Sequence, residues 1–236
     1  TVYTNRPAPG AMRGYGIPQA MFAGESHMED VSRALGVDSI QFRKDHRMPV
    51  GYVDGFSKNE NYADSLGQCM EKGMEYLDYE RKRKEYANQT GPVRRGVGMA
   101  LFWYNTAVWP ISLESSSCRM VLNQDGSLQL QLGETEIGQG ADTAFAQMAA
   151  DTVGIPVDMV HTVSTQDTDL TPFGTGAYAS RQTYVGGFAI KQTGLLLKER
   201  ILAYAKELTR QDVNNLDIQE GYIVRTTDGR KLMRLG

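Results

Sequence analysis

The spacing of apolar residues along the sequence changes near residue 92, from a helix-like pattern to a strand-like one. This change limits which folds the chain can adopt. In the first part, apolar residues recur three or four positions apart, as on the buried face of an amphipathic helix. Pro18 suits the first turn of one such helix, and Asp38 suits the cap of another. The spacing predicts helices over residues 17–35, 38–46 and 61–88.

In the second part, strand and helix patterns are interleaved. Residues 94–104 and 117–133 alternate in the manner of strands, and Asp125-Gly126 within the second run predicts a hairpin. Asp228-Gly229 predicts another. The remaining predictions are a strand over 157–168 and helices over 139–153 and 180–208. We therefore predict an α+β (mixed α/β) fold, with helices packed on a mixed sheet with β-hairpins, divided into a mainly helical segment, 1–92, and a strand/helix segment, 93–236.

Composition excludes several classes of partner. The 236 residues carry a net charge of −3, with 25 basic and 28 acidic residues intermixed, so we expect no nucleic-acid partner. No window approaches the ~18 apolar residues of a membrane span, so we expect no membrane partner. Cys69 and Cys118 have no metal-ligand spacing, which favours the cytoplasm. Both ends look cut from a longer polypeptide, because the chain starts at Thr1 and stops after a hairpin.

Two glycine-rich loops each lead from a strand-like segment into a predicted helix. They read "EIGQGADT" and "GTGAYASRQT". A helix entrance offers unpaired N–H groups and partial positive charge, and glycine lets a ligand approach the backbone. Each loop is a candidate anion site, and two would suit a ligand with more than one phosphate. Each alone is more often only a turn, and neither matches the P-loop or the Rossmann fingerprint.

A third loop, "PGAMRGYGIPQ", places Arg13 and Tyr15 among three glycines. The ring of Tyr15 can stack on a flat ligand, and the guanidinium N–H groups of Arg13 can donate to an oxygen of that ligand. The alternative is an arginine that only ties down a turn.

Other polar residues give weaker signals. The three histidines lack metal spacing, and Asp167 and Asp169 suit a turn better than a cation site. Glu134 and Glu136 precede the "EIGQGADT" bend without a partner at a spacing typical of acid-base catalysis. The serines at 115–117 lack the hydrolase elbow.

Three segments, taken together, resemble one family. "AMRGYGIPQAMFAGESHMEDVSRALGVDSIQFR", "DGSLQLQLGETEIGQGADTAFAQMAADTVGIP" and "GAYASRQTYVGG" occur in the order of the R-G-[FY]-G-x-P-Q, G-T-E-[MI]-G-Q-G and T-x-A-S-R motifs of the molybdenum hydroxylases, the xanthine dehydrogenase and aldehyde oxidoreductase family. The resemblance implies the first molybdopterin-binding subdomain of the large subunit, inactive alone.

The resemblance also implies roles for particular residues. Arg13 orients the substrate and stabilises negative charge on it, and Tyr15 stacks on the substrate ring. The cofactor is molybdopterin with molybdenum, expected as the cytosine dinucleotide. Its predicted contacts are Ile137, Gly138 and Gln139 on the pterin, with Ala179, Ser180 and Gln182 around the pterin and phosphates.

The family further implies hydroxylation, with oxygen from water, of a purine such as xanthine or hypoxanthine, another N-heterocycle or an aldehyde. Electrons then pass to 2Fe-2S and FAD groups on partner subunits or domains. The family's catalytic glutamate, in a downstream G-E motif, has no match after residue 187, and mid-helix Glu25 is no substitute. Opposite Tyr15 the resemblance places Val108 or Trp109, which leaves purine preference open.

Two alternatives remain from the residues themselves. One is a non-catalytic module on the same fold that binds a nucleotide or cofactor. The other is an unrelated nucleotide-binding α/β domain, in which the 138–140 bend would bind ATP with magnesium.

Overall fold

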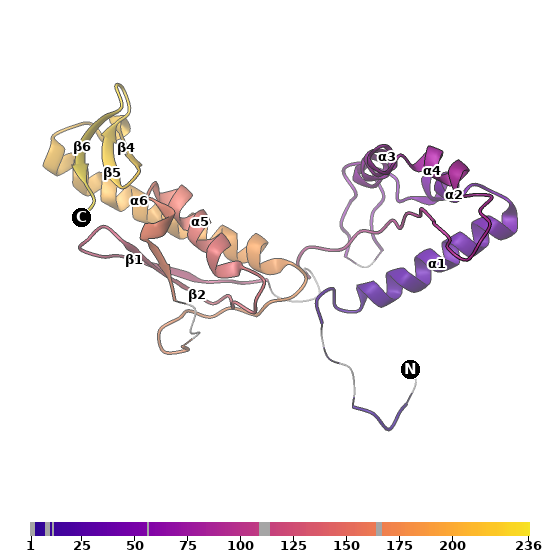
Figure 1. Cartoon of the computed structure of the whole chain (residues 1–236). Coiled ribbons are helices and arrows are strands. Elements are labelled where there is room, and N and C mark those ends of the chain that lie inside the picture. The colour runs from indigo at the N-terminus through magenta and orange to yellow at the C-terminus, as the bar shows by residue number, and fades with distance from the viewer. Residues whose placement is uncertain (1–2, 8–9, 11, 56, 109–113, 164–166) are drawn as a thin grey trace. The chain divides into compact units, whose positions relative to one another are not determined.

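The chain forms two compact units, Thr1–Asn105 and Thr106–Gly236. A computed structural model describes residues 3–7, 10, 12–55, 57–108, 114–163 and 167–236 (Figure 1). Each unit has its own cluster of buried apolar side chains.

The first unit begins with the two helices that the sequence predicts. α1 spans Ile17–Leu35 and α2 spans Ser39–His46. The Asp38 carboxylate accepts hydrogen bonds from the N–H groups of Ile40 (3.0 Å) and Gln41 (2.9 Å), so the predicted cap is confirmed.

The single helix predicted over 61–88 is wrong, because the structure contains two. α3 spans Ser65–Leu77 and α4 spans Tyr79–Glu85. Asp78 between them adopts a left-handed conformation, with φ of 51°, which ends the α-helical hydrogen-bond ladder. The break turns Tyr79 into the core beside Met70. Side-chain periodicity alone does not register a one-residue change of backbone conformation.

The strand predicted over 94–104 is also wrong, although its alternation has a physical cause. Val97, Met99 and Leu101 pack against the core of the first unit, while the residues between them are exposed. Across Val97–Tyr104, all of which the structure describes, no backbone-to-backbone hydrogen bond forms. The segment is extended and half-buried, but it has no neighbouring strand.

The second unit contains a mixed three-stranded sheet of order β1-β2-β3. β1 (Cys118–Leu122) and β2 (Leu128–Leu132) form the predicted hairpin, and β2 pairs in parallel with β3 (Val160–Thr162). The strand predicted over 157–168 is shorter than expected, because a 3-10 turn occupies Val157–Met159. Residues 164–166 of that prediction lie outside the described part.

Two helices cover one face of this sheet (Figure 1). α5 spans Ala141–Val153, and α6 spans Gly187–Thr209 after a π-helical turn over Gln182–Gly186. Both predicted helices are confirmed, with starts a few residues later than expected. Gly194 of α6 has no space for a side chain because Thr152 of α5 lies against it.

A second sheet, of order β4-β5-β6, lies near the end of α6 (Figure 1). β5 (Tyr222–Arg225) and β6 (Arg230–Arg234) form the hairpin predicted at Asp228-Gly229. β4 (Leu216–Gln219), preceded by a 3-10 turn at Val213–Asn215, was not predicted. The mixed α+β architecture is confirmed.

Candidate functional site

The N-terminus of α5 is occupied by a carboxylate of the same chain. Glu136 accepts hydrogen bonds from the backbone N–H groups of Gly138 (2.6 Å), Gly140 (3.1 Å) and Asp142 (3.0 Å). These donors, that of Asp142 first, lower the pKa of the Glu136 carboxyl against the opposing effect of burial. In the structure, these N–H groups at the helix entrance are therefore engaged by a side chain of the same chain.

Two amide side chains join the two glycine-rich loops. Gln139 Nε2 donates to Gln182 Oε1 at 2.6 Å and to the Thr135 carbonyl at 3.0 Å. Gln182 Nε2 donates to the same carbonyl at 2.9 Å, and the Ile137 N–H donates to Gln139 Oε1 at 2.7 Å. The structure thus brings together predicted cofactor residues that are 43 positions apart.

Arg181 joins the same loops from the buried side. Its guanidinium, 0% exposed, donates to both oxygens of Glu134 at 3.0 Å and to Glu114 Oε2 at 2.6 Å. It also donates to the carbonyls of Gly176 (2.9 Å) and Ser115 (2.5 Å). Sequence reasoning did not single out Arg181, and the available signal was an arginine directly after the small residues of "AYAS".

Ala179 and Ser180 precede this arginine in a strained conformation. Both have left-handed backbones, with φ of 45° and 54°. The Ala179 carbonyl accepts a hydrogen bond from the Ala107 N–H at 2.7 Å, and Ser180 is exposed. Such conformations in non-glycine residues persist where surrounding contacts hold them, and they cluster at ligand sites.

The outer side of the 137–140 bend is open. The Ile137 side chain is 67% exposed, and no atom of the described residues beyond the adjoining ones lies within 4 Å of the position that a Cβ would take on Gly138 or Gly140. A ligand can therefore approach the backbone there. The polar groups of the bend and the Gln139 amide lie along this open side, although in the structure the N–H groups of Ile137, Gly138 and Gly140 are bonded to side chains of the same chain.

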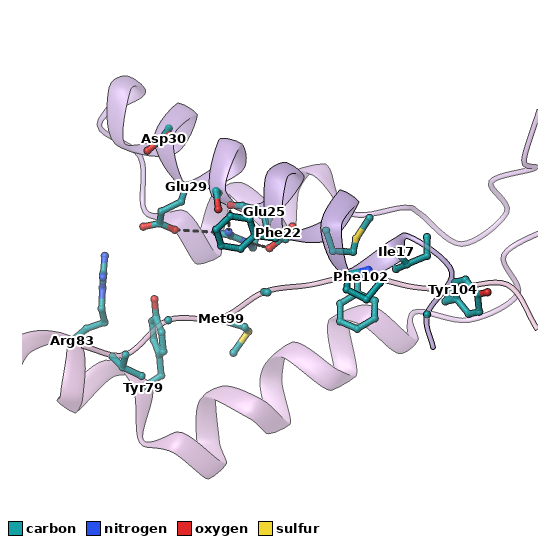
Figure 2. Close-up of a pocket in the computed structure, with 18 of the residues that line it drawn as sticks. Ile17, Phe22, Glu25, Glu29, Asp30, Tyr79, Arg83, Met99, Phe102 and Tyr104 are labelled. Atoms are coloured by element: carbon teal, nitrogen blue, oxygen red, sulfur yellow. Dashed lines mark hydrogen bonds and ion pairs between the residues drawn. The ribbon is translucent and has the colours of Figure 1, made fainter. Parts of the chain in front are cut away.

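Arg13 and Tyr15 lie in the first unit, on the loop before α1. Tyr15 has a left-handed backbone, with φ of 49°, and its side chain is 68% exposed. Arg13 lines a groove of about 900 Å³ within this unit. Figure 2 shows Ile17 and Phe22 of α1 facing Met99 and Phe102 of the extended segment across the groove.

Glu25 in this groove has a structural role. Its Oε2 accepts hydrogen bonds from Arg43 Nε (2.8 Å) and from the Leu101 N–H (2.9 Å). The carboxylate therefore connects α2 and the extended segment to α1.

Some residues that gave weaker sequence signals have defined contacts in the structure. Asp167 Oδ1 accepts a hydrogen bond from the Asp169 N–H at 2.9 Å, so it stabilises its own turn. Among the described residues, no group of histidine, cysteine or acidic side chains is arranged to hold a metal ion. No described helix has the length and apolar character of a membrane span.

Of the two residues expected opposite Tyr15, Val108 donates its N–H to Glu114 at 2.6 Å, and Trp109 lies outside the described residues.

Solved structures share this fold over most of the chain. CO dehydrogenase from Oligotropha carboxidovorans aligns with a TM-score of 0.75 and 20% identity, over 99% of this chain and 31% of that chain. Aldehyde oxidoreductase from Desulfovibrio desulfuricans aligns with a TM-score of 0.63 and 28% identity, over 82% of this chain and 21% of that chain.

Sequence comparison gives nearer relatives. The xanthine dehydrogenase molybdenum-binding subunit of Escherichia coli O157:H7 is 47% identical over 224 residues, which cover 95% of this chain and 30% of that protein. The chain thus spans about 30% of the length of this curated relative. Residues 72–235 and 1–46 match two families that are each described as a molybdopterin cofactor-binding domain. The chain therefore belongs to the molybdopterin cofactor-binding domains of the molybdenum hydroxylases.

Proposed function

We propose that this chain forms one wall of the molybdopterin site in an oxidoreductase that hydroxylates N-heterocycles such as purines, or aldehydes, with oxygen from water. The observation that carries the proposal is the Gln139–Gln182 hydrogen bond, because it joins the second glycine-rich loop to the exposed 137–140 bend. The names of relatives, xanthine dehydrogenase and aldehyde oxidoreductase, support the substrate classes.

The residues divide between cofactor and substrate. Ile137, Gly138 and Gln139 would hold the pterin, and the second loop, through Ala179, Ser180 and Gln182, would close around it. When bound, the cofactor supplies the redox centre that accepts two electrons from the substrate.

Arg13 and Tyr15 would act on the substrate. The always-charged guanidinium of Arg13 would orient an oxygen or ring nitrogen and stabilise negative charge that develops during hydroxylation. Tyr15, largely exposed, would stack on a planar substrate.

The wider assembly follows from the same proposal. The rest of the large subunit would complete the site, and iron-sulfur and FAD subunits or domains would receive the electrons. We further propose the cytosine dinucleotide form of the cofactor and a cytoplasmic location, the latter because Cys69 and Cys118 are both free.

The test uses Arg13→Ala and Gln139→Ala in the full-length enzyme. We expect Arg13→Ala to lower turnover by about 10²-fold or more with the cofactor still loaded, because it removes transition-state stabilisation. We expect Gln139→Ala to lower molybdenum and pterin content. Arg33→Ala on α1 and Gln219→Ala on β4, both exposed, serve as controls.

Equal loss of cofactor in both variants would contradict this division of roles. Assembled wild-type enzyme without molybdenum or pterin would contradict the proposed function itself and favour a non-catalytic binding module.

A further inference from the structure

Glu136 lies at the centre of the bend without contributing a group to its open side. Its two oxygens accept three backbone N–H groups, those of Gly138, Gly140 and Asp142. The side chain is half-buried, whereas residues 137–140 are exposed. The carboxylate therefore supports the bend from within.

The bend needs such support because its backbone is unusual. Gly138 and Gly140 both have left-handed conformations, with φ of 92° and 86°. Glycine populates many other conformations at equal cost, so the sequence itself does not fix this shape. Glu136 fixes two of the N–H groups, and Gln139 Oε1 fixes that of Ile137.

We propose that Glu136 is a positioning residue for the cofactor: its carboxylate holds the Ile137–Gly140 bend in its binding shape and closes the N-terminus of α5 to the cofactor's phosphate groups. This inference rests on the proposed function. It assigns a role to a residue that was first considered as an acid-base candidate, and it removes one of the two predicted phosphate sites.

Electrostatics explains why Glu136 would close the N-terminus of α5 to phosphate. The N-terminus of a helix attracts one anion through its unpaired N–H groups and its dipole. Here the Glu136 carboxylate already accepts those N–H groups, and Asp142 adds a second acidic side chain in the first turn of α5. A phosphate placed there would meet like charge and find the donors engaged.

Cofactor content of the full-length enzyme tests the positioning role. We expect Glu136→Ala to lower molybdenum and pterin content about tenfold, the effect of losing a charged hydrogen-bond acceptor. Glu136→Gln keeps the shape and one acceptor oxygen, and we expect a smaller loss. Asp212→Ala is the matched control, because Asp212 likewise accepts a turn N–H, that of Asn214 at 3.0 Å, away from the bend.

Chemical rescue separates positioning from general stability. Formate added during cofactor reconstitution can occupy the space of the missing carboxylate, so we expect it to raise the cofactor content of Glu136→Ala and not that of Gln139→Ala. Wild-type cofactor content in Glu136→Ala overturns the proposal, and so does a loss that formate leaves unchanged.

Inorganic phosphate tests the closed helix entrance. In cofactor-free protein, we expect phosphate to raise the melting temperature of Glu136→Ala more than that of the wild type, in which only the second glycine-rich loop can bind phosphate. An equal response of both proteins overturns the closure. If Glu136→Ala does not fold, the cofactor content of Glu136→Gln tests the positioning role instead. A wild-type cofactor content in Glu136→Gln then overturns the proposal. Absence of the cofactor from the wild-type enzyme would instead contradict the proposed function.

Discussion

At the scale of single residues, Arg181 determines how the site is built. Its guanidinium is fully buried between Glu134 and Glu114, which lie 47 and 67 positions away in the sequence. A buried charge is tolerated only when opposite charges compensate it, so removal of the guanidinium takes the counter-charge away from the buried carboxylates. Arg181 therefore ties the second glycine-rich loop to Glu134, directly before the first.

We predict that Arg181→Met lowers the free energy of unfolding by about 3–5 kcal/mol, because buried carboxylates lose their counter-charge. Arg225→Met is the control, since the Arg225–Asp228 pair is partly exposed and such pairs contribute about 0–1 kcal/mol. Denaturant unfolding of the full-length protein measures both. Similar values for the two variants would show that Arg181 is not a structural clamp.

Asp228 allows a pH prediction. Hydrogen bonds from the Arg225 side chain and the Arg230 N–H lower the pKa of its carboxyl from 3.8 to about 2. Because the pKa is lower in the folded chain, the pairing stabilises the hairpin above pH 3.8 and is lost as the pH falls through about 2. An NMR titration of the Asp228 carboxyl carbon measures this value, and a midpoint at 3.8 would contradict it.

At the scale of elements, the sequence predicts features with local causes. Helices α1 and α2 follow from apolar spacing and the Asp38 cap, and the hairpins follow from Asp-Gly turns. The glycine loops of the site were found for the same reason. The break at Asp78, the isolated extended segment 94–104, strand β4 and the Arg181 clamp depend on distant contacts, which no local pattern contains.

Two glycines with the same backbone conformation give an element-scale prediction. Gly154, at the end of α5, has φ of 95°, and a Cβ there would collide with the Ile218 carbonyl of β4. Gly138 has φ of 92° and open space around it. Gly138→Ala should therefore cost only the left-handed strain, about 1–2 kcal/mol, and Gly154→Ala clearly more.

Thermal unfolding of the full-length protein compares the two variants. Equal losses of stability would mean that the contact between α5 and β4 is less tight than the structure shows.

At the scale of the whole molecule, the two units differ in how much apolar surface they bury. The core of the second unit runs through β2, α5, α6 and the second sheet, whereas the core of the first consists of Ile40, Met70 and Tyr79 with partly buried neighbours. Opening free energies rise with buried apolar contact.

We predict that backbone amides of β2 and α5 exchange with deuterium more slowly than those of α1 and α3. Hydrogen-exchange mass spectrometry of residues 1–236 measures this directly. Slower exchange in α1 than in α5 would show that the first unit gains stability from contacts other than its own core.

The extended segment Val97–Tyr104 has a practical consequence for anyone who handles this protein. Its peptide groups make no backbone-to-backbone hydrogen bond with the part of the chain that the structure describes, and Phe102 and Trp103 are exposed beside them. An extended segment whose peptide groups have no strand partner can pair with another chain, even though the Leu101 N–H here is held by Glu25. Preparations should therefore be kept dilute.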